Sequence, residues 1–185
     1  AVAINDLKTT GISHAIFNPE KYSLPSFRSI LTSDMKRDLP NYISDYANKD
    51  IQVFNVTDIV EFNNKDTLIH APYGQYIFNE IKEDKVSDSE LEQMKINTKS
   101  QATNYLNKIM TSNDFDIFIS VDNSMAGIAA AAHFPALTIP MGYRSDGQPS
   151  NITFIAKSKN EQLLYNIAYK YENQSKRRVA PKKYN

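Results

Sequence analysis

Three residues of the types found in a Ser–His–Asp catalytic triad, Asp122, Ser124 and His133, lie within twelve positions of one another. A triad needs hydrogen bonds between these side chains. If the segment after Ser124 is helical, Ser124 and His133 lie about 13 Å apart along its axis, at ~1.5 Å per residue. The chain also lacks the G-x-S-x-G motif that exposes a serine nucleophile. We therefore expect no triad in this segment.

Two glycines, Gly142 and Gly147, have the spacing of a phosphate-binding loop and follow a short apolar run. Such a loop needs a Lys for the phosphates and a Ser or Thr for Mg²⁺ directly after the second glycine. Gln148 and Pro149 occupy these positions, and the β-branched and aromatic residues at 152–155 are typical of a strand. We therefore predict a turn between two strands.

The remaining histidines, His14 and His70, are isolated from each other and from any carboxylate pair with metal-ligand spacing. The chain has no cysteine, which excludes disulfides, thiolate metal sites and a cysteine nucleophile. We expect neither a metal nor a cofactor.

Acidic and basic residues balance at 21 each, so no net field attracts nucleic acid or an anionic membrane. Basic residues cluster only at 176–178 and 182–183, which we interpret as a solvated tail. No run approaches the roughly 18 apolar residues of a membrane span, and no signal peptide is visible. We expect no nucleic-acid or membrane partner and favour the cytoplasm.

Helical periodicity dominates the first two thirds of the chain. One pattern, from Ile30 to Tyr46, runs through Pro40 and predicts a bent helix or two abutting short ones. A capping box of Ser87 and Glu90 begins the longest pattern. Its stripe of core-contact positions is Leu91, Met94, Thr98, Ala102, Tyr105 and Ile109. The other expected elements are a helix ended by Gly11, strands at 12–17 and 52–55, a short helix capped by Thr57, and a helix from Gln75 to about Lys82 that buries Tyr76 and Ile77.

The last third alternates strands and helices. A small-residue helix is expected over Asn123–His133, and a Ser158–Glu161 capping box begins a final amphipathic helix. This alternation predicts one α/β domain over residues 1–185, with a mixed β-sheet that contains an antiparallel hairpin and is flanked by helices. The expected strands lie at 115–121, 135–140 and 151–156.

An ordered array of short motifs lies within the run FDIFISVDNSMAGIAAAAHFPALTIPMGYRSDGQPSNITFIAKSKNEQLLYNIAYKYENQSKRRVAP. The motifs are Asp116, Pro135-Ala136-Leu137-Thr138, Pro140, Asp146-Gly147, Pro149, Phe154, Glu161, Leu163-Leu164, Glu172, Arg178 and Pro181. This array resembles the C-terminal end of the amidase signature family, whose members hydrolyse amide bonds. The upstream pieces LPNYISDY, DIVEFNN and YGQYIF resemble the middle region of the family's longer bacterial members. The fold implied is the C-terminal portion of the amidase signature fold.

Three positions depart from the family pattern, which has Gly where this chain has His133, Asn151 and Ala156. Asn and His are enriched at positive φ, so a left-handed backbone is compatible with the first two positions. Ala156 predicts an ordinary β conformation instead. The family's Pro after the first strand is also missing, and the segment there is short.

The family's enzymes use a Ser nucleophile, a second Ser that bridges through a cis peptide, and a Lys base, within a Gly/Ser-rich run. This chain has five scattered glycines and no Ser-Ser pair, so it contains no catalytic residue that can be assigned. By the order of family elements, those residues belong upstream of Ala1, where the first helix also lacks a capping residue. We expect the C-terminal part of an amidase, inactive alone and self-associating through strand edges and apolar surface.

The resemblance places five residues at the channel for a small-molecule amide substrate: Asp122, Asn123, Ser124, Tyr73 and Gln75. A buried polar side chain there could recognise the polar end of a substrate, because an unpaired polar group in a desolvated pocket is costly. An equal alternative is that these residues cap helices and fill loops.

Two other functions stay open at this point. A free-standing, non-enzymatic α/β ligand-binding or assembly domain predicts a monodisperse and cooperatively folded chain. An enzyme with an unrecognised site is less favoured, because no convergent set of histidines and carboxylates is evident.

Overall fold

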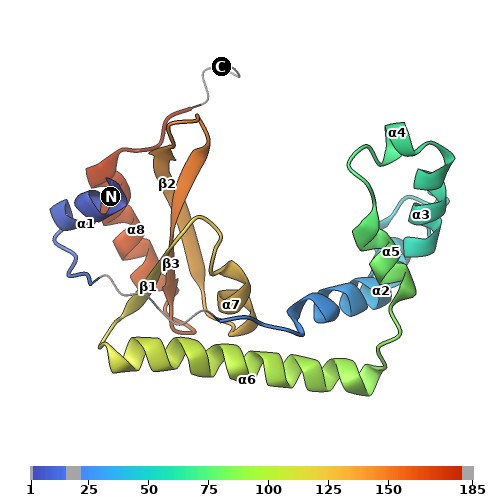
Figure 1. Ribbon diagram of the computed structural model, residues 1–185, viewed down its shortest axis with the longest axis horizontal. Coiled ribbons are helices and arrows are strands. Elements are labelled where there is room, and N and C mark those ends of the chain that lie inside the picture. The colour runs from blue at the N-terminus through green and yellow to red at the C-terminus, as the bar shows by residue number, and fades with distance from the viewer. Residues whose placement is uncertain (1, 16–21, 181–185) are drawn as a thin grey trace. The chain divides into compact units, whose positions relative to one another are not determined.

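The structure, a computed structural model, describes residues 2–15 and 22–180 (Figure 1). Its contacts divide the chain into two compact units. The sheet unit comprises Ala1–Leu24 and Thr98–Asn185, and the helical unit comprises Pro25–Asn97. This division by contacts does not test the expectation of a single domain over residues 1–185, which stays a prediction.

Three antiparallel strands form the sheet, in the order β1-β3-β2. They are β1 (Ile117–Val121), β2 (Ala136–Tyr143) and β3 (Pro149–Ala156). The turn between β2 and β3 is closed by hydrogen bonds from the Arg144 N–H to the Gln148 carbonyl (2.8 Å) and from the Gly147 N–H to the Arg144 carbonyl (3.0 Å). Gly147 has φ 83°, in the left-handed region that favours glycine. The predicted α/β class and its antiparallel hairpin are confirmed, and the described strands pair only in antiparallel fashion.

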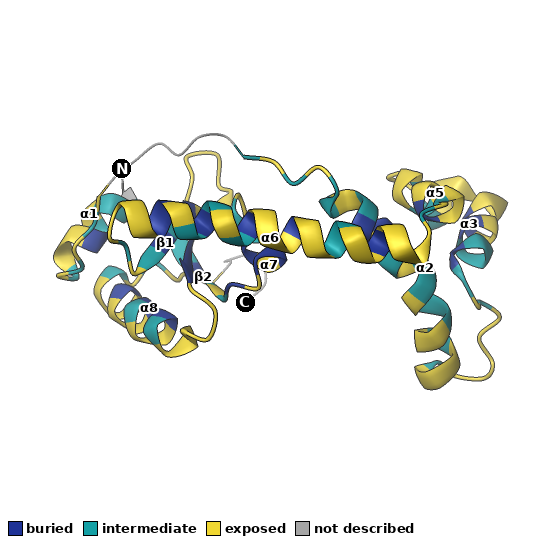
Figure 2. Ribbon diagram, turned by 90° about the horizontal axis from the view of Figure 1, so that it is seen from below, coloured by how far each residue is buried: buried dark blue, intermediate teal, exposed yellow. Residues whose placement is uncertain are grey.

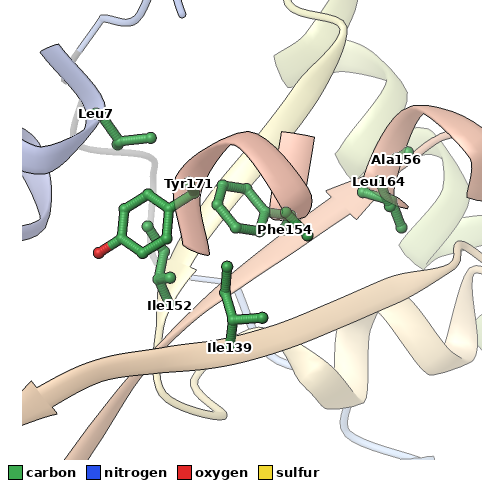
Figure 3. Close-up of a cluster of buried hydrophobic side chains, with 8 residues drawn as sticks. Leu7, Ile139, Ile152, Phe154, Ala156, Leu164 and Tyr171 are labelled. Carbon is green, nitrogen blue, oxygen red and sulfur yellow. The ribbon is translucent and has the colours of Figure 1, made fainter. Parts of the chain in front are cut away.

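The apolar core of the sheet unit lies between the sheet and two helices, α1 (Val2–Thr9) and α8 (Glu161–Ser175). Ile152, Phe154 and Ala156 alternate along β3, so they share one face of the sheet. The Phe154 and Tyr171 rings meet edge to face in this core, with centroids 5.9 Å apart (Figure 3). The other buried members are Leu7, Ile139, Leu164 and Ala168.

A row of hydroxyl side chains crosses the other face of the sheet. Ser120 of β1 and Thr138 of β2 are both paired with Thr153 of β3. The Thr138 and Thr153 hydroxyls are hydrogen-bonded at 2.8 Å. A short helix, α7 (Ala126–Ala131), follows β1, and its buried side includes Ile128 and Ala129.

The long helix α6 (Asp88–Ser112) contributes residues to both units. The predicted capping box is confirmed, because the Ser87 N–H donates to Glu90 Oε2 (2.9 Å) and the Glu90 N–H donates to Ser87 Oγ (3.3 Å). Figure 2 shows buried positions recurring along the helix. Leu91, Thr98 and Ala102 of the predicted stripe are buried, which confirms its role in packing.

Four helices lie wholly within the helical unit: α2 (Phe27–Tyr46), α3 (Val56–Lys65), α4 (Thr67–His70) and α5 (Tyr76–Glu83). Val56, Val60 and Ile81 form its buried cluster. Across this unit, the Arg28 guanidinium pairs with Glu80, and the buried Ser33 hydroxyl donates to Asp84 Oδ1 at 3.0 Å. α2 continues through Pro40 as one helix, so the alternative of two abutting helices is wrong.

Several local predictions are wrong. Residues 12–15 and 52–55 form no strand, and residues 16 and 17 lie outside the described part of the chain. Asn55, not Thr57, caps α3, because its side chain accepts from the Thr57 and Asp58 N–H groups. Tyr76 and Ile77 are exposed.

Some predictions for the final helix and for the three positions where the amidase signature family has Gly are confirmed, and others are wrong. α8 begins after Asn160, whose side chain makes no capping bond, so the predicted Ser158–Glu161 capping box is wrong. His133 has φ 57°, as its place at a family glycine allows. Asn151 has no positive φ and lies within β3. Ala156 also lies within β3, which confirms its predicted β conformation.

Among residues 2–15 and 22–180, none of the helices is both long and apolar enough to span a membrane.

Candidate functional site

Asp122 directly follows β1, and its backbone and side-chain polar groups are hydrogen-bonded to the hairpin. Its N–H donates to the Asn151 carbonyl (2.8 Å), and its carbonyl accepts from the Thr153 hydroxyl (2.6 Å). Oδ1 accepts from the Asn151 N–H (2.7 Å) and from the Ser150 hydroxyl (3.2 Å). Oδ2 accepts from Arg144 in an ion pair. Asp122 is therefore an anchor between the end of β1 and the hairpin.

The ionised form of Asp122 is favoured by this environment. The Asn151 N–H bond lowers the pKa of its carboxyl group below the ordinary value of 3.8, and the Ser150 bond and the Arg144 charge act in the same direction. Partial burial opposes the shift. Asp122 is therefore an anion at neutral pH, and its carboxylate is already engaged by three donors.

Asn123 and Ser124 follow Asp122 in a turn and differ from it in exposure. Both side chains are exposed, and neither is hydrogen-bonded to another side chain or backbone group within the described ranges. The turn itself is held by the backbone, with the Ser124 N–H directed to the Val121 carbonyl (3.3 Å) and the Ala126 N–H to the Asn123 carbonyl (3.2 Å). These two side chains are the free polar groups of the predicted site in the sheet unit.

Ser124 also lines a cleft of about 730 Å³ within the sheet unit. The cleft runs beside β1 and is bordered by α1 and by the segment that follows α1. Its walls are mainly apolar, as ligand pockets commonly are. The Ser120 hydroxyl borders the cleft too, and it is buried without a hydrogen-bond partner among the described residues.

Tyr73 and Gln75 lie in the helical unit, in the loop before α5. The Gly74 N–H donates to the Ala71 carbonyl (2.8 Å), and the turn so formed leaves Tyr73 99% exposed. Gln75 accepts from Asn63 Nδ2 (3.1 Å) and donates to Asn64 Oδ1 (2.6 Å). Gln75 thus fixes the loop against α3, and Tyr73 is the side chain that the loop presents.

The expectation of no triad agrees with the contacts of these residues. The Asp122 carboxylate is bonded to Arg144, Ser150 and Asn151. His133 is exposed in the turn after α7, and among the described residues no hydrogen bond joins it to Asp122 or Ser124. The site also includes residues that the sequence did not indicate: Arg144 and Ser150 lie 22 and 28 positions from Asp122.

Comparison with known proteins gave consistent results. No family model matches the chain. It is 21% identical over 154 residues to a probable amidase from Arabidopsis thaliana, covering 82% of this chain and 30% of that protein. An amidase family protein from Bacillus anthracis superposes with a TM-score of 0.80 at 27% identity, covering 97% of this chain and 36% of that one. The resemblance to amidases is confirmed.

The same fold is found in a peptide amidase from Stenotrophomonas maltophilia, with a TM-score of 0.79 at 20% identity. That match covers 97% of this chain and 39% of the peptide amidase. The chain therefore spans between 30% and 39% of the length of these three proteins, and it matches the fold of the two solved structures over 97% of its own length.

Proposed function

We propose that this chain is the C-terminal part of an amidase that hydrolyses amide C–N bonds in small-molecule substrates. The observation that carries the proposal is the likeness to the Bacillus anthracis amidase family protein over 97% of the chain with a TM-score of 0.80. The nucleophile, the bridging serine and the lysine base belong to a part of the amidase upstream of these residues. This chain supports the fold and contributes to the substrate channel.

Within this function, the exposed side chains Asn123 and Ser124 are the substrate-contacting residues of the sheet unit. Tyr73 is the candidate that the helical unit offers by itself. Asn123 offers an amide that both donates and accepts, which suits a substrate carrying an amide group. Gln75 acts indirectly, because both polar atoms of its side chain are bonded to asparagines of α3.

The proposal is tested by assaying ammonia release from simple amides. The 185-residue chain alone is expected to show no turnover above buffer. An amidase polypeptide that carries this segment behind a Gly/Ser-rich run with paired serines is expected to be active. In that polypeptide, Asn123→Ala and Ser124→Ala are expected to raise KM, and Lys157→Ala, an exposed change after β3, serves as the control.

Two results would contradict the proposal. Turnover by the isolated chain that survives purification would place catalytic residues within it. An inactive longer polypeptide, together with a monodisperse isolated chain, would favour the non-enzymatic binding or assembly domain.

Self-association is a separate part of the proposal. β1 is an edge strand of the described sheet and consists of Ile, Phe, Ile, Ser and Val, without the charge, proline or bulge that usually protects an edge. β2, the opposite edge, has Pro140 and a bulge between Pro140 and Gly142. We expect the isolated chain to associate along β1. Light scattering measures this association in the wild type and in the Ile119→Lys variant, which places a charge on the strand. A monomeric wild type contradicts this part.

A further inference from the structure

We propose that Asp122 and Arg144 form a positioning pair that holds the exposed Asn123–Ser124 turn in place, and that Asp122 itself makes no contact with the substrate. The inference rests on the proposed function, since the turn is taken to border the amide substrate. It changes the role of Asp122 from recognising a substrate to orienting the residues that do.

The first step is the engagement of Asp122. Its N–H, its carbonyl and both carboxylate oxygens are bonded to β3 or to the hairpin turn. Three donors, from Arg144, Ser150 and Asn151, already occupy the carboxylate, so a substrate group would compete with them for it. Displacing a charged or backbone donor leaves a polar group unpaired, which is costly.

The second step is the backbone conformation. Asp122 has φ 51°, in the left-handed region that non-glycine residues adopt only rarely. The residue is held there by bonds on both its backbone and its side chain. The left-handed conformation redirects the chain at the end of β1, and this sets where the next two side chains lie.

The third step is the rigidity of Arg144. Its N–H and its carbonyl are both bonded within the hairpin turn, to Gln148 and Gly147. The guanidinium therefore projects from a fixed piece of backbone to Asp122 Oδ2. The hairpin turn, Arg144 and Asp122 form one continuous connection from the sheet to the Asn123–Ser124 turn.

Amide hydrogen exchange on the 185-residue chain tests the anchoring directly. Asp122→Gly keeps the left-handed backbone accessible and removes the carboxylate, and Arg144→Gln removes the charged donor. Both are expected to speed exchange at the Ser124 and Ala126 amides by about tenfold or more, the size of a lost charged hydrogen bond. Exchange at Phe154, within the core of the sheet, should change less than at the turn.

Asp114→Asn is the matched control. Asp114 is also an aspartate with a left-handed backbone, at φ 54°, but it is exposed, and its carboxylate makes no hydrogen bond within the described ranges. This variant should leave exchange at the Ser124 amide unchanged. Equal effects of Asp114→Asn and Asp122→Gly would overturn the assignment, because the anchor would then have no local action.

The second arm measures kinetics in the active amidase polypeptide that carries this segment. Asp122→Asn and Arg144→Gln are expected to raise KM about tenfold with a much smaller change in kcat. A raised KM with unchanged exchange at the turn would mean that Asp122 contacts the substrate and would overturn the inference. If the wild-type polypeptide is inactive, the proposed function fails, while the exchange experiment still decides whether Asp122 anchors the turn.

Discussion

Tyr171 lies fully buried in the core of the sheet unit. Because of this burial, we expect the free energy of unfolding of the unit to fall at alkaline pH. Burial raises the pKa of the Tyr171 hydroxyl to about 12, and the nearby Asp6 carboxylate acts in the same direction. In the unfolded chain, the hydroxyl has its ordinary pKa of 10.0. Since the folded pKa lies above the unfolded one, the contribution is fully present below pH 10 and is lost as the pH rises toward 12.

The size of the effect follows from the shift. A change of one pKa unit corresponds to about 1.4 kcal/mol, so the full shift corresponds to ~3 kcal/mol. At pH 11.5 the unfolded hydroxyl is almost fully ionised and the folded one mostly neutral, and integration gives a loss of about 2 kcal/mol relative to pH 9. This loss comes on top of the losses from other groups that titrate in the same range.

The measurement compares urea unfolding at pH 9 and pH 11.5 for the wild type and for Tyr171→Phe, followed by circular dichroism. The variant should be close to the wild type at pH 9, because the Tyr171 hydroxyl bonds only distantly to Asp6 Oδ2, at 3.5 Å. It should lose about 2 kcal/mol less between the two pH values. Tyr169→Phe is the control, because Tyr169 lies on the same helix and is 72% exposed.

Two results would refute the reasoning. Equal alkaline losses for the wild type and Tyr171→Phe would mean that Tyr171 ionises as easily in the folded state as in the unfolded state. A similar protection by Tyr169→Phe would mean that the effect comes from removing any tyrosine of α8.

Three further predictions concern individual side chains. Ser120→Ala removes a buried hydroxyl without a partner among the described residues and should raise the free energy of unfolding by about 1 kcal/mol. Ser150→Ala loses a hydrogen bond to Asp122 and should lower the free energy of unfolding by a similar amount. A destabilising Ser120→Ala contradicts this. Asn55→Ala should cost about 1 kcal/mol in the helical unit, whereas Asn160→Ala, at a helix start without a capping bond, should cost less than about 0.5 kcal/mol; equal losses contradict the assigned caps. Because the folded pKa of Asp122 is lowered, its stabilisation is present above its ordinary pKa of 3.8 and is lost as the pH falls through the lower folded pKa. Acid unfolding should therefore be less steep for Asp122→Asn, and an unchanged profile refutes the point.

Periodicity predicted the elements whose packing agrees with their local pattern. The hairpin was found because an apolar run, an Asp–Gly turn and a β-branched run follow one another without interruption between 136 and 156. The stripe of α6 was found because its apolar positions repeat over 25 residues, long enough for the pattern to be clear. The resemblance to amidases was confirmed for a similar reason, since it rested on the order of many weak motifs.

Predictions from local patterns were wrong where two neighbouring residues could both cap the same helix. Asn55 and Thr57 are both capping residues, and only the exact first turn of α3 decides between them. A stretch as short as 52–55, in which only the two middle residues are apolar, carries too little periodicity to distinguish a strand from a connection without strand pairing, and the structure has the connection. Tyr76 is exposed with Arg28 over its ring, a contact that spacing along the helix does not indicate.

The candidate site shows why the role of a residue is harder to predict than its position. The sequence indicated the segment after the first strand but predicted a helix from Asn123, whereas α7 begins at Ala126 and an exposed turn precedes it, next to a cleft. It could not indicate that three donors engage the Asp122 carboxylate, because these donors lie 22 to 29 positions away and meet it only through the register of β1 with β3. Once that register is fixed, Asp122 is the residue of the turn whose side chain is most engaged in hydrogen bonds. The polar side chains of this turn without a hydrogen bond among the described residues are then its two uncharged neighbours, Asn123 and Ser124.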